Sequence, residues 1–564
     1  QIARASVLIK SVDWTSPIVV LASPTSTNQG SSFNIKSKIA IKGSIIYDGS
    51  FTGTSEWLIS PPLSNEKVKS NILSPLILPI GDIAGNGRLP TLILSGYTLN
   101  EATLYTFTLR TTLSNGKIGE SFVRILTNSA PLPGSFQVAP NNGTEINTIF
   151  TFQNLNWEDS DLPISYSFGY ITKGAFLLSQ KRSEHSEAKI LLPAGLIENE
   201  FHIECVTRIY DSLNANNSLV QVVNVYPTDN QGTEARGNML LDLAESLSEI
   251  NTEPFELDRA KQIIGAVTTS INAVNCTMLP SFNESSCTAL HRIPCESTPH
   301  TCGPCLNDEM IGEEGDANTP CFIDRDSIQN DVSKKCKADC YGHGTCVFVA
   351  QNSTYSSPFN YLQACSIFDN TCMAKCECSE GYVGKWCDFL PGALQTRQNT
   401  RKALIMRLMN DSAYDDPVLD SFEAHGSLIS ALMEKPDEIN EQTKDILRSN
   451  ALSSINMGKS KSFPFQSTIP LFNAFDSFSE IVTGSILSNQ SRDEIREAIS
   501  LFMDIGTNEV VAGQKVPLKF QGKNLDIVTN AGAELSLPLS LQKKYMLEEM
   551  GADLSRPMVV SNSR

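Results

Sequence analysis

The cysteines of this chain are concentrated in one segment. Fourteen of the 15 cysteines lie between Cys276 and Cys387, and the remaining one is Cys205. Cysteines at this density are typical of small domains that are held together by disulfides in an oxidising compartment. The pattern therefore predicts an extracellular protein, either secreted or at the cell surface, with a disulfide-rich segment in the middle of the chain.

The length and net charge of the chain further restrict the class of protein to which it can belong. A chain of 564 residues exceeds what one hydrophobic core usually organises, so we expect several domains. Its net charge of −18 disfavours nucleic acid and anionic lipid as partners. Its apolar runs fall far short of the ~20 residues of a membrane helix, which predicts no membrane contact within this segment. Because Gln1 is not preceded by a leader, we expect a processed or excised segment whose anchor, if any, lies beyond Arg564.

The first 228 residues carry a β pattern. Short apolar or alternating stretches are separated by Asn, Gly, Pro and Ser, as in all-β domains. Two stretches, residues 92–125 and 190–225, repeat one order: an apolar strand, a small-residue turn and two alternating strands. We therefore predict two immunoglobulin-like β-sandwiches, over residues 1–130 and 131–228. The expected strands include Ser6–Lys10, Phe33–Ile41, Leu104–Leu109 and Ser121–Leu126.

One part of the second sandwich carries a family signature. The segment Asn154-Leu-Asn-Trp157-Glu-Asp-Ser-Asp161-Leu-Pro163, followed by Leu191-Leu-Pro-Ala-Gly195 and Asp211-Ser-Leu213, resembles the REJ module, the receptor-for-egg-jelly region of polycystin-1-like proteins. The resemblance extends over roughly residues 80 to 275. It implies an extracellular β module that is followed directly by a helical segment.

Helical periodicity appears on both sides of the cysteine-rich segment. Apolar stripes in residues 229–275, interrupted at Asn251-Thr-Glu-Pro254, predict a helical hairpin. Further stripes predict a small helical bundle over residues 389–505, and short strands predict a β segment over 506–564. This order is similar to the GAIN region of adhesion receptors and polycystins, but no autoproteolysis motif is present and no cleavage residue is implied.

The later cysteines follow a known spacing. Cys336, Cys340 and Cys346 are followed by Cys376-Glu-Cys378-Ser-Glu-Gly-Tyr-Val-Gly-Lys-Trp-Cys387, which resembles an EGF-like domain over residues 336–388. This resemblance implies the disulfides Cys336–Cys346, Cys340–Cys376 and Cys378–Cys387, with Cys365 and Cys372 paired inside an insertion. Such bridges, worth about 2 to 4 kcal/mol each, replace the core that so short a unit cannot build.

The earlier cysteines predict a second disulfide-rich module over residues 276–335, formed by Cys276, Cys287, Cys295, Cys302, Cys305 and Cys321. Six cysteines allow fifteen connectivities, and the sequence selects none. Cys302-Gly-Pro-Cys305 matches the thioredoxin tetrapeptide, but no βαβ pattern surrounds it, so we expect structural bridges. Zinc binding involving His343 is the less favoured alternative, because it requires reduced thiolates. Cys205 is expected to be a buried free thiol.

Two kinds of candidate site remain. Glu158, Asp159, Asp161 and Asp211 are acidic positions that could meet at one end of the second sandwich and bind calcium; a solvated acidic loop is the plainer interpretation. No other cofactor is expected.

Asn-x-Ser/Thr sequons predict N-glycans on surface loops at Asn142, Asn216, Asn275, Asn283, Asn352, Asn410 and Asn489.

These features predict a non-catalytic extracellular glycoprotein with structural or adhesive function. No nucleophile elbow, zinc-protease helix or phosphate loop occurs in the sequence. The favoured interpretation is a subunit of an extracellular filament or surface appendage, such as a flagellar hair, that assembles with itself or with other extracellular proteins and glycans. The alternatives are the ectodomain of a polycystin-like receptor and a secreted hydrolase.

The cysteine pattern makes a direct prediction about thiol content. After denaturation without reductant, a thiol reagent should titrate one group per chain, at Cys205, because the other fourteen cysteines should be paired. Peptide mapping under non-reducing conditions would identify the pairs. Recovery of several free thiols from residues 276–387 would contradict the disulfide scheme.

Overall fold

The structure is a computed structural model. None of the described helices is both long and apolar enough to cross a bilayer. The structure describes residues 16–22, 32–47, 51–64, 70–80, 90–172, 174–228, 232–247, 254–274, 276, 285–295, 298–307, 310–313, 315–323, 332–350, 361–369, 371–479, 489–510, 518–522 and 525–529.

The first β-sandwich has its own core. Alternating strands turn one face inward, where Trp57, Tyr105 and Phe107 are almost fully buried. The expected strand Ser6–Lys10 lies outside the described residues. One sheet has the order β2 (Ser32–Asn34), β8 (Ile118–Asn128), β7 (Leu104–Leu113), β4 (Gly53–Ser60) and β5 (Ile77–Pro79); the other has the order β1 (Ile18–Leu21), β3 (Ile39–Ile46) and β6 (Thr91–Leu94).

The second sandwich repeats the topology of the first strand for strand. Its five-stranded sheet also contains one parallel pair, β10 with β16, which corresponds to β2 with β8. The two sandwiches are therefore copies of one architecture. The larger sheet has the order β10 (Asn142–Thr144), β16 (Asn216–Tyr226), β15 (His202–Tyr210), β12 (Ser165–Thr172) and β13 (Ala175–Ser183); the smaller has the order β9 (Ser135–Ala139), β11 (Ile149–Leu155) and β14 (Glu187–Leu191).

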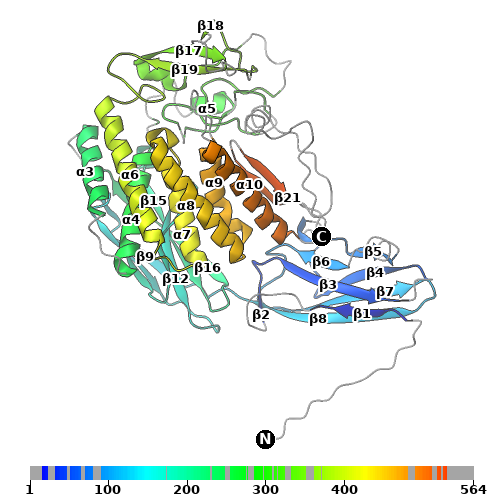
Figure 1. The fold of residues 1–564 in the computed structure, drawn as a ribbon. Helices are drawn as coiled ribbons and strands as arrows, with labels where there is room; N and C mark the ends of the chain where they lie inside the picture. Colours follow the sequence, from blue (N-terminus) through cyan, green and yellow to red (C-terminus); the bar gives the residue numbers. More distant parts are fainter. Residues whose placement is uncertain are drawn as a thin grey trace.

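Seven helices of the described part of the chain form a layer beside the second sandwich (Figure 1). Helix α3 packs mainly against α6 and makes a smaller contact with α4, and α4 packs against β13, α6 and α7. A β-hairpin, β20 (Leu518–Gln521) and β21 (Asp526–Thr529), follows the last of them. The helices are α3 (Gly232–Ser246), α4 (Pro254–Asn272), α6 (Pro391–Ser412), α7 (Leu419–Leu432), α8 (Glu441–Ser460), α9 (Ile469–Phe478) and α10 (Asn489–Glu509).

One hydrophobic core joins the second sandwich, the helices and the final β-hairpin. It runs without interruption from Phe136 in β9 to Ile527 in β21. Phe520 of β20 lies 4.8 Å from the ring of Phe472 in α9 and 5.1 Å from that of Phe502 in α10. The sequence patterns predicted four separate segments in this region: residues 131–228, 229–275, 389–505 and 506–564. In the structure these segments share a single interior, because each has an apolar face that only the others cover.

The disulfide-rich segment is an insertion into this helical layer. Arg401 of α6 donates hydrogen bonds of 2.8 Å to Glu438 and 2.7 Å to Asn272, the last residue of α4. The helices before and after the segment are therefore tied together, although residues 276–388 separate them. The segment itself contains α5 (Ser285–Ala289), β17 (Gly344–Ala350), β18 (Tyr361–Leu362) and β19 (Cys372–Cys378).

Seven disulfides cross-link this insertion. In its second part, the structure joins the same cysteines that the EGF-like resemblance implied. The tight loop there requires Gly381 (φ +88°) and Gly384 (φ +102°), since a Cβ at Gly384 would lie 2.6 Å from the Asp388 carboxylate. The pairs are Cys276–Cys295, Cys287–Cys302, Cys305–Cys321, Cys336–Cys346, Cys340–Cys376, Cys365–Cys372 and Cys378–Cys387.

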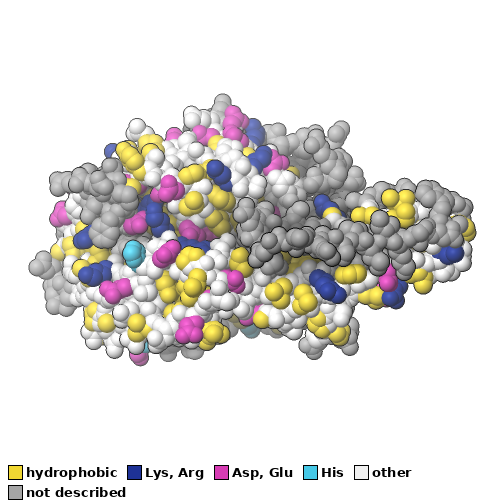
Figure 2. All heavy atoms as spheres, turned by 90° about the horizontal axis from the view of Figure 1, so that it is seen from below, with side chains coloured by type: hydrophobic (Ala, Val, Ile, Leu, Met, Phe, Trp, Pro, Cys, Tyr) yellow, Lys and Arg dark blue, Asp and Glu magenta, His cyan; other side chains and the backbone are white. Residues whose placement is uncertain are grey.

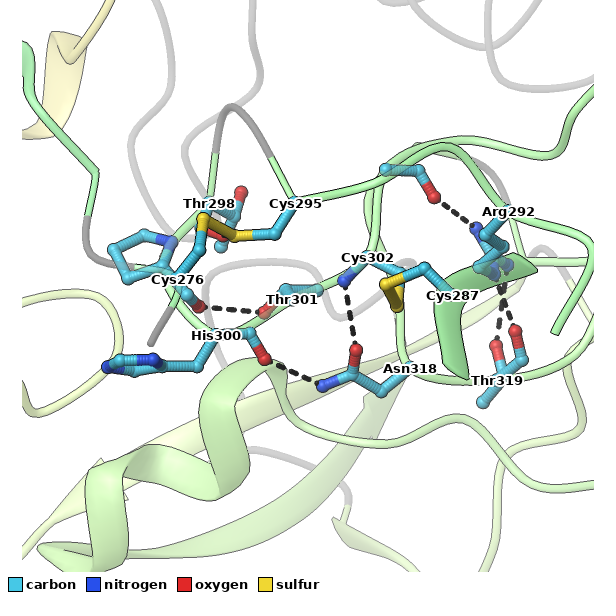
Figure 3. The surroundings of a disulfide bond; sticks show 12 residues. Cys276, Cys287, Arg292, Cys295, Thr298, His300, Thr301, Cys302, Asn318 and Thr319 are labelled. Carbon is cyan, nitrogen blue, oxygen red and sulfur yellow. Dashed lines mark hydrogen bonds between the residues drawn. A yellow bond between two sulfur atoms is a disulfide. The ribbon is translucent and has the colours of Figure 1, made fainter. Parts of the chain in front are cut away.

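A buried arginine organises the first part of the insertion (Figure 3). The Arg292 side chain is fully buried, and its guanidinium donates hydrogen bonds to the backbone carbonyls of Gly303, Glu313, Gly315 and Thr319. Four carbonyls, one from Gly303 and three from the stretch 313–319, thus converge on one side chain. This hub and the disulfides hold loops that have almost no apolar core of their own.

A buried carboxylate connects the second sandwich to the helices. Glu145 is fully buried and accepts hydrogen bonds from Arg236 of α3 at 2.6 Å and Ser270 of α4 at 2.7 Å. Burial by itself would raise the pKa of Glu145, but the hydrogen bond and charge of Arg236, together with Ser270 and Thr228, hold it below its ordinary value of 4.5. Its contribution to stability is therefore complete above pH 4.5 and is lost as the pH falls through the folded-state pKa.

Replacing this carboxylate should loosen the attachment of the helices. We expect Glu145→Gln to lower the free energy of unfolding by about 2 to 3 kcal/mol, because Arg236 loses its charged partner. The matched control is Glu120→Gln, which removes an exposed pair with Arg110 and should cost less than about 0.5 kcal/mol. Chemical denaturation at pH 7 measures both, and equal effects would contradict the role of Glu145.

Candidate functional site at the junction of the two sandwiches

The Asp211 carboxylate lies where the two sandwiches meet. It follows β15 and is fully buried. Its Oδ1 accepts hydrogen bonds from the backbone N–H groups of Leu213 and Ala215, at 2.9 and 2.8 Å, and so fixes the turn into β16. Its Oδ2 accepts a hydrogen bond from the side chain of Asn128, the last residue of β8. The Asp211 side chain thus shapes a turn in the second sandwich and also binds Asn128 of the first sandwich.

The structure brings three of the four predicted acidic residues together. Carboxylate oxygens of Asp159, Asp161 and Asp211 lie within 4.8 Å of one another. Glu158 is not part of this group: its side chain is exposed and its backbone carbonyl pairs with the N–H of Leu132. Asp159 and Asp161 are in the β11–β12 loop, where the N–H of Asp161 donates a 2.7 Å hydrogen bond to the Asp159 carboxylate.

The electrostatics of this cluster favour a cation. Burial raises the pKa of Asp211 and the nearby Asp159 charge acts in the same direction, while the hydrogen bonds from Asn128, Ala215 and Leu213 oppose the rise. Close carboxylates repel one another, and a hard cation with oxygen ligands would relieve that repulsion. The donor set therefore fits calcium, although the protein donors already occupy much of the Asp211 carboxylate.

Two lysines of the first sandwich complete the junction. The Lys36 ammonium donates a 2.6 Å hydrogen bond to the backbone carbonyl of Asn216 and a second to its side chain. Lys38 donates to the backbone carbonyl of Glu509 at the end of α10, which connects the first sandwich to the helical layer. Sequence patterns gave no signal for either lysine, because each lies near its partner only after the chain has folded.

The predicted glycan sites occupy different environments. Asn142 in β10 and Asn410 in α6 are exposed, although Asn410 lies in a helix and not in a loop. Asn216 is half-buried beside Lys36. Asn489 begins α10, and its side chain is not described. The remaining sequons, Asn275, Asn283 and Asn352, lie outside the described residues.

The cysteine sulfurs do not form a metal site in the described part of the chain. Those of Cys336, Cys340 and Cys376 lie close together, but each belongs to a disulfide and offers no thiolate. Cys205 is a buried free thiol, and burial raises its pKa far above the ordinary value. This thiol is therefore protonated at neutral pH and packs as an apolar side chain.

Comparison with known families identifies the N-terminal part of the chain. Residues 13–263 match the REJ domain. This range contains both sandwiches and α3, and it ends within α4. No curated protein sequence matches the chain.

Solved structures with similarity to the chain are distant. The chain is similar to a structure described as a Ca²⁺-stabilised, ice-binding adhesin of an Antarctic bacterium, with 11% identity over 39% of this chain and a TM-score of 0.22; it covers about half, 51%, of that structure. It is also similar to the N-terminal eight Ig domains of Down Syndrome Cell Adhesion Molecule, with 10% identity, coverage of 38% of this chain and 25% of that chain, and a TM-score of 0.19. For murine CEACAM1b the identity is 12%, the coverage is 38% of this chain and 100% of that chain, and the TM-score is 0.15.

Calcium should stabilise the junction if the acidic cluster binds it. We expect about 2 mM CaCl₂ to raise the melting temperature by a few degrees relative to EDTA, since extracellular calcium modules bind in the ~0.1 to 1 mM range. The double variant Asp159→Asn/Asp161→Asn should abolish this shift, and Asp493→Asn, at an exposed position on α10, should preserve it. An unchanged melting temperature in CaCl₂ would leave Asp211 with its structural role alone.

Proposed function

Because residues 13–263 form a REJ domain, we propose that this chain is a non-catalytic extracellular protein with structural or adhesive function, and that it acts as a subunit of a filament or surface appendage. The REJ match and the seven disulfides support an extracellular setting. The observation that carries the proposal is the continuous core between the second sandwich and the helices, which makes one rigid body from segments far apart in sequence.

A rigid body of this kind suits a load-bearing role. Pulling on one end of the unit requires a large apolar interface to separate at once, because the core joins the sheet to the helical layer. The insertion, which has little core, is restrained by disulfides that force cannot unravel without breaking a covalent bond. N-glycans at the exposed Asn142 and Asn410 would cover parts of the outer surface.

Charged side chains of both signs are mixed on the face of the molecule drawn in Figure 2, so this face does not favour a partner of one particular charge. Figure 2 shows acidic, basic and apolar side chains interspersed on the face seen from below, with no broad area of one sign. The overall negative charge still disfavours nucleic acid and anionic membranes. Partners of this protein are accordingly proposed to be further copies of the chain, or other extracellular proteins and glycans.

A polycystin-like receptor ectodomain is the second candidate. The specific observation in its favour is the order of elements, in which a helical layer is followed by β20 and β21, and Phe520 of β20 is inserted among the helices. A helical part followed by a packed β part is what the GAIN resemblance implies. In this role the same rigid unit would present a ligand-binding or force-sensing surface outside the cell.

Self-association separates the two candidates. For the purified glycoprotein we expect the molar mass from light scattering to increase between about 1 and 100 μM, and negative-stain images to show strands with a regular repeat, as mass action requires of a polymer. A parallel sample treated with endoglycosidase controls for masking of contacts by glycans. A monodisperse monomer in both samples across this range would contradict the filament proposal and favour the receptor ectodomain.

A further inference from the structure

A cavity of about 290 Å³ lies between the second sandwich and the helical layer. Its sheet wall includes Ser167 of β12, Phe176 of β13 and Arg208 of β15. Its helical wall includes Asp420 and Glu423 of α7. This volume fits one small molecule. Asp159, Asp161 and Asp211 are not among the residues that line it, and nothing in the sequence pattern pointed to it.

Strand register places the sheet residues on one face. Ser167 and Arg208 are direct cross-strand partners in the antiparallel pair of β12 and β15. Partners in a strand pair point to the same side of a sheet, so both side chains face the cavity wall. Helix α7 packs along β13, the edge strand of the sheet, and brings its first turn to the same place. Asp420 and Glu423 are three residues apart and lie on one face of that helix.

The Arg208 guanidinium is positioned but not paired. It stacks on the ring of Phe176, with 3.8 Å between its Cζ and the ring centroid. Within the described residues, it makes no hydrogen bond or salt bridge. The neighbouring Arg182 differs, because it donates to Ser165 and to the backbone carbonyl of Asp211. Arg208 thus keeps its donors available in a fixed plane, as in sites that bind carboxylates.

The two carboxylates are also unpaired. Neither Asp420 nor Glu423 has a side-chain hydrogen bond or salt bridge to another described residue. Burial raises the pKa of both carboxyls. At Asp420 the charges of Arg182 and Arg208 oppose the rise, and at Glu423 the charge of Arg208 opposes it while that of Asp420 adds to it. Two acidic groups and Arg208 therefore line one cavity, and none of these three side chains forms a hydrogen bond or salt bridge with a described residue.

A buried hydroxyl adds an independent sign of a missing ligand. Ser167 is only 3% exposed, and its Oγ has no hydrogen-bond partner among the described residues. A buried polar group without a partner costs free energy, and such groups are rare unless water or a ligand satisfies them. Since Ser167 lines the cavity, an occupant of the cavity is the natural partner.

These charges restrict the chemistry of the occupant. A divalent cation is disfavoured because the Arg208 guanidinium would lie in its coordination sphere and only two carboxylates are present. A simple anion is disfavoured by those same carboxylates. A neutral sugar would give the three charged side chains no partner of opposite charge. A molecule that carries both an ammonium and a carboxylate matches all three charged side chains.

We propose that this cavity binds a free α-amino acid, whose ammonium group is held by Asp420 and Glu423 and whose carboxylate is held by Arg208. The Ser167 hydroxyl hydrogen-bonds the ligand carboxylate. The ligand side chain lies against Leu178 and Pro470, which supply the apolar part of the wall. Because the sheet and α7 each contribute charges, the ligand clamps the sandwich to the helical layer.

Isothermal titration calorimetry of the intact protein with the twenty proteinogenic amino acids tests this proposal. We expect at least one to bind with a Kd below about 1 mM. The matching amine without the carboxylate, and the matching carboxylic acid without the amine, should each bind at least about tenfold more weakly, because each loses one charge-assisted contact. D-glucose and CaCl₂ serve as the neutral and divalent probes.

Variants locate the site. Asp420→Asn, Glu423→Gln and Arg208→Gln should each weaken binding at least about tenfold. The controls Asp493→Asn and Arg496→Gln, which remove a surface pair on α10, should leave it unchanged. Circular dichroism checks that each variant is folded.

Three results would overturn the proposal: no amino acid binds up to about 10 mM, glucose or calcium binds in preference, or the variants bind as the wild type does. Because the assay measures a ligand and not polymer formation, its outcome is independent of the proposed filament role.

Discussion

The architecture of this chain depends on apolar contact between the second sandwich and the helices. Leu177 of β13, Gly265 of α4 and Leu428 of α7 meet at one point, and a Cβ at Gly265 would lie 3.1 Å from Leu177. This close approach seats α4 and α7 against the sheet. It covers the apolar side chain of Leu177 on β13. The helical layer, the final β-hairpin and the cavity beside α7 all follow from it.

Buried polar groups then fix the register of this apolar contact. Glu145 connects the β10–β11 region to α3 and α4, and Glu438 joins Arg397 and Arg401 of α6. Hydrophobic packing is not directional, whereas these hydrogen bonds are satisfied in one arrangement only. The Arg401 network also fixes the two ends of the disulfide-rich insertion, so the insertion can be cross-linked independently without disturbing the layer beneath it.

The two sandwiches show one topology used in two ways. The first encloses its own core around Trp57, while the second opens its core to the helices. The REJ match ends inside α4, at residue 263, although Val267 and Ile271 of the same helix belong to the shared core. The family boundary and the physical boundary therefore differ. A fragment cut at the family boundary would expose apolar surface that α6 and α7 cover in the whole chain.

Local patterns in the sequence determined much of this structure. Alternation of apolar residues indicated the strands and the repeat of the sandwich, stripes indicated the helices, and cysteine spacing indicated an oxidised segment, because each signal is carried by residues close together in the chain. The sequence also predicted that Glu158, Asp159, Asp161 and Asp211 could meet, and three of the four do. Only the tertiary structure decided that Glu158 stands apart and that Asn128 holds Asp211. It also decided that the described helices α3, α4 and α6 to α10 share one core with β20 and β21, and that Ser167, Arg208, Asp420 and Glu423 line one cavity. These relations join residues tens to hundreds of positions apart, and they arise from the packing of surfaces whose partners no local pattern specifies.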